Sequence, residues 1–379
     1  MDGDALVNYA PALKLGLLAL LLAMIPLARV WLRQGAPIRQ RLAQLTALTL
    51  FLTFDLMVFG SFTRLTDSGL GCPDWPGCYG QASPLGAASQ IAAAEQAMPS
   101  GPVTWNKAWI EMIHRYLAMS VGVLILVMAA VSWLRRRELP HSPWWPTLTL
   151  LWVVIQGLFG RYTVTWKLYP AIVTAHLLGG LLLLALLAVQ HERYRARPFA
   201  LACGVRRLAL VTLGILALQI TLGGWVSTNY AVLACPDFPT CHAQWWPSMD
   251  FRNGFAPFRE LGHRADGELL SFEALVAIHF VHRWFAVVAA LALLVLGLRL
   301  RRQDLPEARR FGAGLIGLTL LQLLTGLSNI VLGWPLAAAL VHAGGAAAMV
   351  LLLSLLLARC APSRQAAVAP LKAPQQAVC

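Results

Sequence analysis

The stretch EMIHR, residues 111–115, stands near the start of a long apolar run that covers residues 109–131. A run of this length can cross the hydrocarbon core of a bilayer as a helix. Glu111 and His114 are three residues apart, so a helix places both on one face. An acid and an imidazole inside a membrane helix are costly, and they indicate a functional site.

This stretch has a later counterpart, HFVHR at residues 279–283, which also opens a long apolar run. Two further histidines, His176 and His342, each stand alone in an apolar run. A lone membrane histidine commonly forms a hydrogen bond between helices. Four histidines in two matched pairs favour a shared role as ligands instead.

The composition is that of a polytopic membrane protein. The chain has 379 residues, of which 58% are hydrophobic and 12% are charged, and its mean hydropathy is +0.64. The formal net charge of +13 comes from arginines in short loops between apolar runs, so it does not indicate nucleic-acid binding. The acidic start, residues 1–4, differs from a secretory signal, and we expect the first apolar run to be retained.

We expect an all-α fold that crosses the membrane nine times, because nine apolar runs approach the required length. Arginines cluster in alternate loops, which places the N-terminus outside and the C-terminus in the cytoplasm. The two long connections, residues 64–106 and 229–270, are then extracytoplasmic, and we call them the outer segments. The predicted spans are 13–32, 42–63, 108–133, 147–165, 170–190, 207–228, 272–299, 311–332 and 335–357.

The chain repeats itself after roughly 166 residues. Cys72 to Cys78 returns as Cys235 to Cys241, His114-Arg115 as His282-Arg283, and His176 as His342. The repeat predicts two pseudo-symmetric four-helix transmembrane bundles in the same orientation. The expected parts are an extra helix with its loop in 1–41, bundles in 42–191 and 207–358, a linker in 192–206, and a disordered tail in 359–379.

In each half, the two histidines lie on helices that start outside, roughly 10 Å below the outer surface at ~1.5 Å per residue. Two histidines at one depth in a four-helix bundle can ligate a haem iron from both faces. His279 aligns with Glu111 in the repeat, so we take His282 as the ligand.

The sequence allows more than one interpretation for several charged residues. Glu111 could take a proton or stabilise positive charge during a reaction, or it could form an ion pair with an arginine. Arg115 and Arg283 could extend to the surface or pair with haem propionates. Asp55, inside the second apolar run, could pair with a neighbour, serve a proton path or lie in a polar bundle centre.

The outer segments carry two cysteine pairs, Cys72 with Cys78 and Cys235 with Cys241, each six residues apart. An oxidising compartment permits disulfides there. Structural disulfides, redox-active or haem-handling pairs, and a four-cysteine zinc site all remain open, although the spacing is longer than that of usual zinc sites.

The combined stretches resemble bacterial haem A synthases of the cysteine-containing type. The resemblance covers about residues 42–357, and the extra helix at 13–32 departs from the family, which usually has eight. The matching stretches are TRLTDSGLGCPDWPGC at 63–78, EMIHR at 111–115, TAHLLGG at 174–180, GGWVS at 223–227, the second cysteine pair and HFVHR at 279–283.

The resemblance implies an oxidoreductase that converts the C8 methyl group of haem O to the formyl group of haem A for cytochrome oxidase. It implies that His114 and His176 bind the substrate haem iron, and that His282 and His342 hold a resident haem b. Glu111 would assist the chemistry. The remaining implied contacts are disulfides Cys72–Cys78 and Cys235–Cys241, and haem propionate or loop contacts of Arg64, Arg115 and Arg283.

The resemblance also implies a multi-pass protein of the bacterial inner membrane, surrounded by lipid. A haem O synthase and an electron donor or acceptor are expected partners, nucleic acid is not, and a homo-oligomer stays open. The rival functions are a di-haem b-type electron carrier, a haem transporter, and a membrane disulfide oxidoreductase that uses a quinone. The electron carrier gives Glu111 no role, the disulfide oxidoreductase leaves the histidines unexplained, and the transporter would release its haem unaltered.

Overall fold

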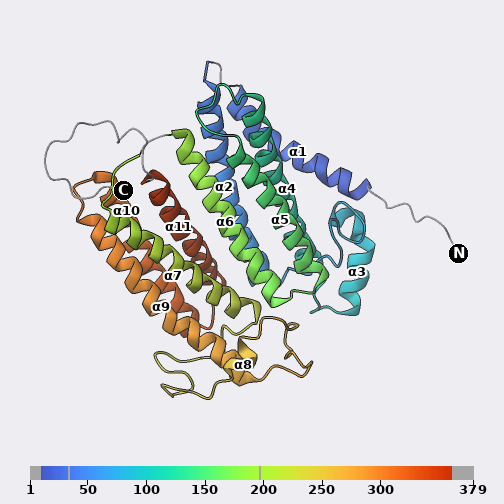
Figure 1. The fold of residues 1–379 in the computed structure, drawn as a ribbon. Coiled ribbons are helices and arrows are strands. Elements are labelled where there is room, and N and C mark those ends of the chain that lie inside the picture. Colours follow the sequence, from blue (N-terminus) through green and yellow to red (C-terminus); the bar gives the residue numbers. More distant parts are fainter. Residues whose placement is uncertain (1–9, 33–34, 196–197, 361–379) are drawn as a thin grey trace. The chain divides into compact units, whose positions relative to one another are not determined.

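A computed structural model of the chain describes residues 10–32, 35–195 and 198–360. Nine helices in these ranges are long and apolar enough to cross a membrane, which confirms the predicted all-α polytopic fold. The predicted disordered tail lies outside the described residues from position 361 on. The long helices are α1 (Ala10–Trp31), α2 (Ile38–Leu65), α4 (Trp105–Leu134), α5 (Trp144–Thr165), α6 (Pro170–Arg195), α7 (Cys203–Thr228), α9 (Phe272–Arg301), α10 (Pro306–Val331) and α11 (Leu336–Arg359) (Figure 1).

Several hydroxyl groups inside these helices are satisfied within the helix. In α2 the hydroxyls of Thr46, Thr49 and Thr53 each donate to the carbonyl four residues earlier, at 2.7–2.9 Å. This pattern removes the cost of placing a hydroxyl in an apolar span. The two helices that carry the paired histidine stretches begin alike, with side-chain caps from Thr104 on α4 and Ser271 on α9.

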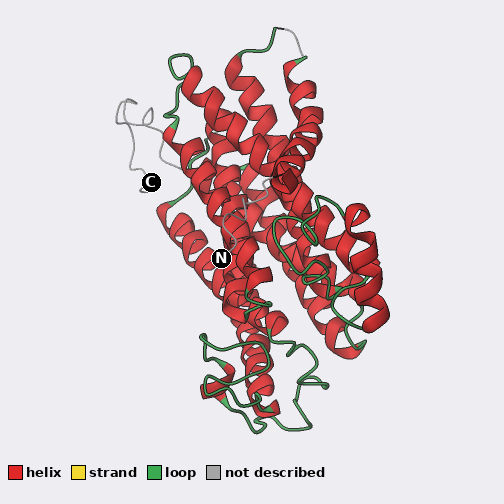
Figure 2. Cartoon of the chain, turned by 90° about the vertical axis from the view of Figure 1, so that its right-hand side faces the viewer, coloured by secondary structure: helices red, strands yellow, loops and turns green. Residues whose placement is uncertain are grey.

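The outer segments contain short helices that the apolar pattern did not predict. They are a 3₁₀ turn (Pro84–Ala87), α3 (Ala88–Ala97) and α8 (Phe251–Gly254). The rest of both segments is loop, as the green trace in Figure 2 shows. These helices are too short and too weakly apolar to show in a search for spans.

The chain divides into two compact units, residues 1–168 and 169–379. In the first unit α4 contacts α1, α2 and α5, so the additional helix α1 packs directly on the histidine helix. Leu15 of α1 joins the buried cluster that contains Cys72 and Cys78. The extra helix therefore supports the first cysteine pair.

In the second unit, α7, α9, α10 and α11 form a closed ring in which each helix contacts the next. Helix α6 packs outside this ring, on α7 and α11. An ion pair between the buried Glu192 and the partly exposed Arg359 joins α6 to α11, with 3.0 Å between Oε2 and Nε. The contacts thus group α6 with the second unit, whereas the repeat groups it with the first half, and the bundle limits inferred from the repeat remain a prediction.

Candidate functional site

Two disulfides confirm the predicted cysteine pairing. Disulfide bonds join Cys72 to Cys78 and Cys235 to Cys241. We call the closed stretches 72–78 and 235–241 the first and second cysteine loops. All four sulfur atoms are buried. Because the thiols are consumed in disulfides, the alternative of a four-cysteine zinc site is wrong.

An aspartate organises each loop from within. In the first loop, Asp74 accepts hydrogen bonds from the backbone N–H groups of Tyr79 and Gly80, at 2.6 and 2.7 Å. In the second, Asp237 accepts from the N–H groups of His242 and Ala243, at 2.6 and 2.9 Å. These four donors have positive φ angles between 50° and 69°, so the carboxylates stabilise a left-handed turn that side chains disfavour.

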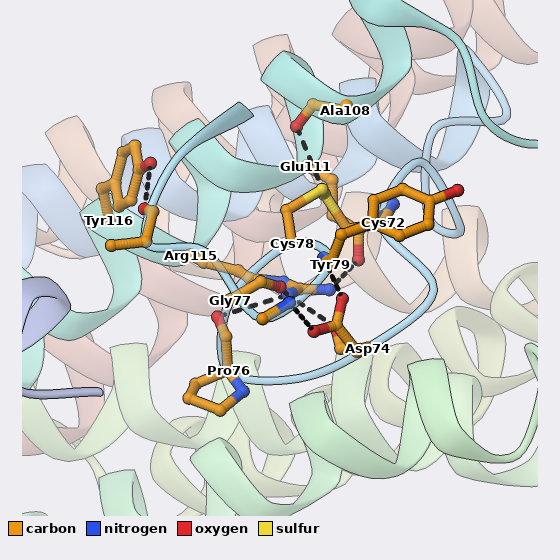
Figure 3. The surroundings of a disulfide bond; sticks show 12 residues. Cys72, Asp74, Pro76, Gly77, Cys78, Tyr79, Ala108, Glu111, Arg115 and Tyr116 are labelled. Carbon is orange, nitrogen blue, oxygen red and sulfur yellow. Dashed lines mark hydrogen bonds and ion pairs between the residues drawn. A yellow bond between two sulfur atoms is a disulfide. The ribbon is translucent and has the colours of Figure 1, made fainter. Parts of the chain in front are cut away.

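Helix α4 holds the first loop through Glu111 and Arg115, as Figure 3 shows. Glu111 Oε2 accepts a hydrogen bond from the N–H of Cys72 at 2.8 Å. Its other oxygen pairs with Arg115, four residues on, and both side chains are buried. The ion pair that the sequence left open for Glu111 is therefore present, and it is tied to the disulfide.

The Arg115 guanidinium donates hydrogen bonds to three carbonyl groups of the first loop. It donates to the carbonyl of Asp74 at 2.8 Å, to that of Pro76 at 3.3 Å, and to that of Gly77. Arg115 therefore makes loop contacts, and in this arrangement its charge is neutralised by Glu111. The same grouping appears in Figure 3, where the loop wraps around the guanidinium.

Helix α9 holds the second loop in the same way with one chemical difference. His279 Nδ1 accepts the N–H of Cys235 at 3.1 Å, which is the position that Glu111 takes in the first half. Arg283 donates to the carbonyls of Pro239 and Thr240 at 3.2 and 3.1 Å. His279 is thus occupied by the loop, which agrees with the choice of His282 as the ligand.

The second unit brings His282 and His342 near enough to interact electrostatically. His282 lies on α9, and Gln219 of α7 contacts its Nδ1 at 3.1 Å and its carbonyl at 3.3 Å. The Gln219 amide nitrogen donates, so Nδ1 accepts and a neutral ring carries its proton on Nε2 in this arrangement. Nε2 becomes a ligand once that proton is lost or moves to Nδ1.

On α11, Thr325 and Gln322 of α10 orient His342. The Thr325 hydroxyl lies 3.0 Å from Nδ1 and donates its proton to the carbonyl of Leu321 at 2.8 Å. With the hydroxyl proton on that carbonyl, the oxygen accepts a hydrogen bond from Nδ1–H, and Nε2 is then the unprotonated nitrogen. Gln322 donates to the carbonyl of His342 at 2.8 Å. A hydrogen bond at the ring nitrogen that does not bind the metal, here Nδ1 with Thr325, is typical of a metal-ligating histidine.

Glycines on neighbouring helices make room for three of the four histidine rings. A Cβ at Gly60 would lie 2.9 Å from His114 Nε2, and one at Gly223 would lie 2.8 Å from His282 Cε1. At Gly326 the distance to His342 Cε1 would be 3.3 Å. Larger residues would push the rings away, which explains glycine at these places.

In the first unit, the ring of His114 stacks on Phe59 of α2, with 6.5 Å between centroids and an interplanar angle of 11°. In the second unit, His176 on α6 has a buried Nδ1 without a hydrogen-bond partner. Gln156 of α5 is buried, and neither of its amide atoms has a partner. Buried polar groups are normally satisfied, so the orphaned His176 nitrogen suits a site that acquires a further group.

Arg64 belongs to a separate group of charged residues in the first outer segment. Arg64 lies 4.0 Å from Asp67, and Lys107 lies 3.6 Å from the same carboxylate. Asp67 is more than half exposed, so these contacts contribute little to stability.

The residues present fit haem groups. His282 and His342 are paired within one helix ring with Nε2 of His342 unprotonated, and imidazole pairs on facing helices are a common way to hold haem iron. Sequence reasoning found both histidines but missed Gln219 and Thr325. The signal for them was their place in apolar runs, where Gln219 lies four residues before Gly223 and Thr325 directly precedes Gly326.

The fold and site define a class: an all-α membrane protein that pairs histidines in its spans and holds disulfide loops over them. The family model for COX15-CtaA, described as cytochrome oxidase assembly protein, matches residues 43–355. The chain belongs to this family.

Several curated relatives bear the name heme A synthase. The protein from Shewanella oneidensis is 38% identical over 318 residues, which cover 83% of this chain and 94% of the relative. The protein from Rhizorhabdus wittichii is 28% identical over 85% of this chain and 94% of its own length. That from Paracoccus denitrificans is 27% identical over 78% of this chain and 81% of its own.

Proposed function

We propose that the chain is a haem A synthase that oxidises the C8 methyl group of haem O to a formyl group, through a hydroxymethyl intermediate. The product, haem A, would serve cytochrome oxidase assembly. The observation that carries the proposal is the oriented pair of His282 and His342, in a chain similar along most of its length to heme A synthases.

Two haem sites are part of the proposal. His282 and His342 hold a resident haem b, and when bound it supplies a one-electron redox centre. His114 and His176, which the repeat matches to that pair, bind the iron of the substrate haem. Thr325 holds the His342 imidazole with Nδ1 occupied, and Gln219 fixes the position of the His282 ring.

Glu111 is the proposed catalytic group beside the substrate. It lies three residues before His114 on α4, so the two side chains are neighbours on one helix. Arg115 and the Cys72 N–H hold its two oxygens, and a carboxylate held in this way can stabilise positive charge or receive a proton at a fixed place. The Cys72–Cys78 disulfide and its loop act as the support for this carboxylate.

The proposed surroundings follow from the same function. The protein lies in a bacterial inner membrane, with lipid around its spans, and receives haem O from a haem O synthase in that membrane. An electron donor or acceptor completes the reaction. The assignment of Arg64, Arg115 and Arg283 to haem propionates remains a prediction, because the contacts described for Arg115 and Arg283 serve their loops.

The test is the identity of the haems that the protein makes. The chain is expressed in a host that produces haem O but no haem A, and the membrane haems are separated by chromatography. Haem A or its hydroxymethyl precursor is expected. If folded, haem-loaded protein yields only haems b and O, the chain is an electron carrier or a haem transporter instead.

A further inference from the structure

Asp55 is the only acidic residue in α2, and it lies near the middle of the span. Its side chain is exposed. Within the described part of the chain, no hydrogen bond or ion pair holds its carboxyl group. An unpaired carboxyl group at this depth is costly in lipid, and such groups mark sites for a polar partner.

The two sides of α2 differ. One side is buried and includes Leu42, Leu45, Thr49 and Thr53. Helix α2 packs on α4 and on α1. Phe51, which is 62% exposed, precedes Asp55 by one turn, and Phe59 follows it by one turn. Asp55 therefore lies between two aromatic residues on a stripe of α2 that is outside its buried side.

The same stripe reaches His114. The Phe59 ring stacks on the His114 imidazole, and Phe62 contacts Phe59 with 5.8 Å between ring centroids. Asp55 is four residues from Phe59 along α2, which is ~6 Å at the rise of an α-helix. The carboxyl group thus lies about one turn deeper in the span than the His114 ring.

The substrate offers one hydroxyl group that suits this position. The propionates of haem O lie on one edge of the macrocycle and are charged, so they favour the aqueous side of the membrane. The opposite edge carries the hydroxyfarnesyl chain, with its hydroxyl close to the ring. The distance from the iron to that edge is comparable to one helical turn.

We propose that Asp55 accepts a hydrogen bond from the hydroxyl group of the hydroxyfarnesyl chain of haem O, and thereby selects this substrate. The inference rests on the proposed function, because it places the substrate iron at His114. A polar group built to bind a substrate hydroxyl disfavours an analogue without it, since the group is then left unpaired in an apolar site.

The test compares two haems with the same farnesyl carbon skeleton. Haem O is titrated into the full-length protein after the resident site has been filled with haem b, and binding is followed by the Soret band. Dehydrated haem O, which has lost the hydroxyl as water, is titrated in parallel. The wild-type protein should bind haem O about tenfold to a hundredfold more tightly, as expected for a hydrogen bond to a carboxylate.

Three variants decide the outcome. Asp55→Leu, which suits a membrane helix, should bind both haems alike, whereas Asp55→Asn keeps an oxygen acceptor and should retain part of the preference. Phe51→Leu, one turn away on the same stripe, should leave the preference unchanged. An unchanged preference in Asp55→Leu, an equal loss of affinity for both haems, or no preference in the wild type would overturn the inference.

A fourth variant separates this inference from the proposed function. His114→Ala should lose binding of both haems at the substrate site. If His114→Ala binds both haems as the wild type does, the assignment of the substrate site has failed, whatever Asp55 does.

Discussion

A single hydroxyl on α10 determines which nitrogen of His342 is available. Thr325 donates to the helix and therefore accepts from Nδ1–H, which leaves Nε2 without a proton. This hydrogen bond joins two residues that are 17 positions apart in sequence and lie on different helices. At this scale, the ligand strength of the imidazole is set by its neighbour and not by the histidine alone.

We predict that Thr325→Val weakens resident haem binding by about tenfold to a hundredfold, because the imidazole loses the group that orients it. Haem content per protein and a Soret titration measure the effect. Thr319→Val is the matched control, since the Thr319 hydroxyl is buried on the same helix and donates to the carbonyl of Leu315. Equal haem affinity in the two variants would contradict the role of Thr325.

The second cysteine loop should respond to acid through Asp237. Hydrogen bonds from the Thr240 hydroxyl and from the N–H groups of Ala243 and His242 lower the pKa of Asp237 from 3.8 to about 2. Because the folded pKa is depressed, its stabilisation is fully present above the ordinary value and is lost as pH falls through about 2.

Hydrogen exchange of the loop amides measures how the Asp237 carboxylate stabilises the second cysteine loop. In the wild type, protection of the His242 and Ala243 amides should decrease as pH falls from 3.8 to about 2, beyond the intrinsic change of exchange rate. In Asp237→Asn, protection should be weaker and should not follow this titration. The same profile in both proteins would show that the carboxylate does not hold the loop.

At the scale of elements, α4 and α9 hold their cysteine loops through the same arrangement of contacts. Each begins with a hydroxyl cap, accepts the N–H of the first cysteine of a loop, and places an arginine four residues later against loop carbonyls. They differ in the acceptor, a carboxylate at Glu111 and an imidazole at His279. The difference is what gives only the first unit a candidate catalytic acid.

We predict that Glu111→His keeps the first cysteine loop but lowers conversion of haem O by at least about a hundredfold, the usual contribution of a positioned acid or base. An imidazole can accept the Cys72 N–H as His279 accepts that of Cys235, so the loop should survive. Haem A formed per bound haem O measures conversion.

Resistance of the Cys72–Cys78 disulfide to an impermeant reductant measures the loop in the same samples. Glu111→Gln is the companion variant, because it keeps an oxygen acceptor and removes the charge. Wild-type conversion in both variants would leave Glu111 as a residue that only holds the loop. A loop that becomes reducible in both would mean that lost conversion reflects lost structure.

At the scale of the whole molecule, the repeat supplies two similar sets of parts, and their contacts are organised differently. The second unit closes a ring of four helices around His282 and His342. The additional helix α1 packs on the first unit and contributes Leu15 to the cluster around the first disulfide. This asymmetry fits the proposal that one half holds a cofactor and the other acts on a substrate.

The nine spans and both disulfides could be predicted because their signals are local. A span is a run of apolar residues that a bilayer requires, and each cysteine pair is only six residues apart. The ends of spans were less predictable, and α2, for example, begins at Ile38, four residues before the predicted start. Arginine and glutamine extend such helices beyond the apolar run at little cost.

The sequence by itself determined the class of this protein: membrane spans, a repeated architecture, two histidine pairs and two closed cysteine loops. The tertiary structure alone decided the partners, such as Glu111 with the Cys72 N–H, Thr325 with His342, and the unpaired state of Asp55. The physical reason is how far apart in the sequence the interacting groups lie. Apolar runs act through transfer to lipid residue by residue, whereas hydrogen bonds join groups that only packing of separate helices brings within about 3 Å.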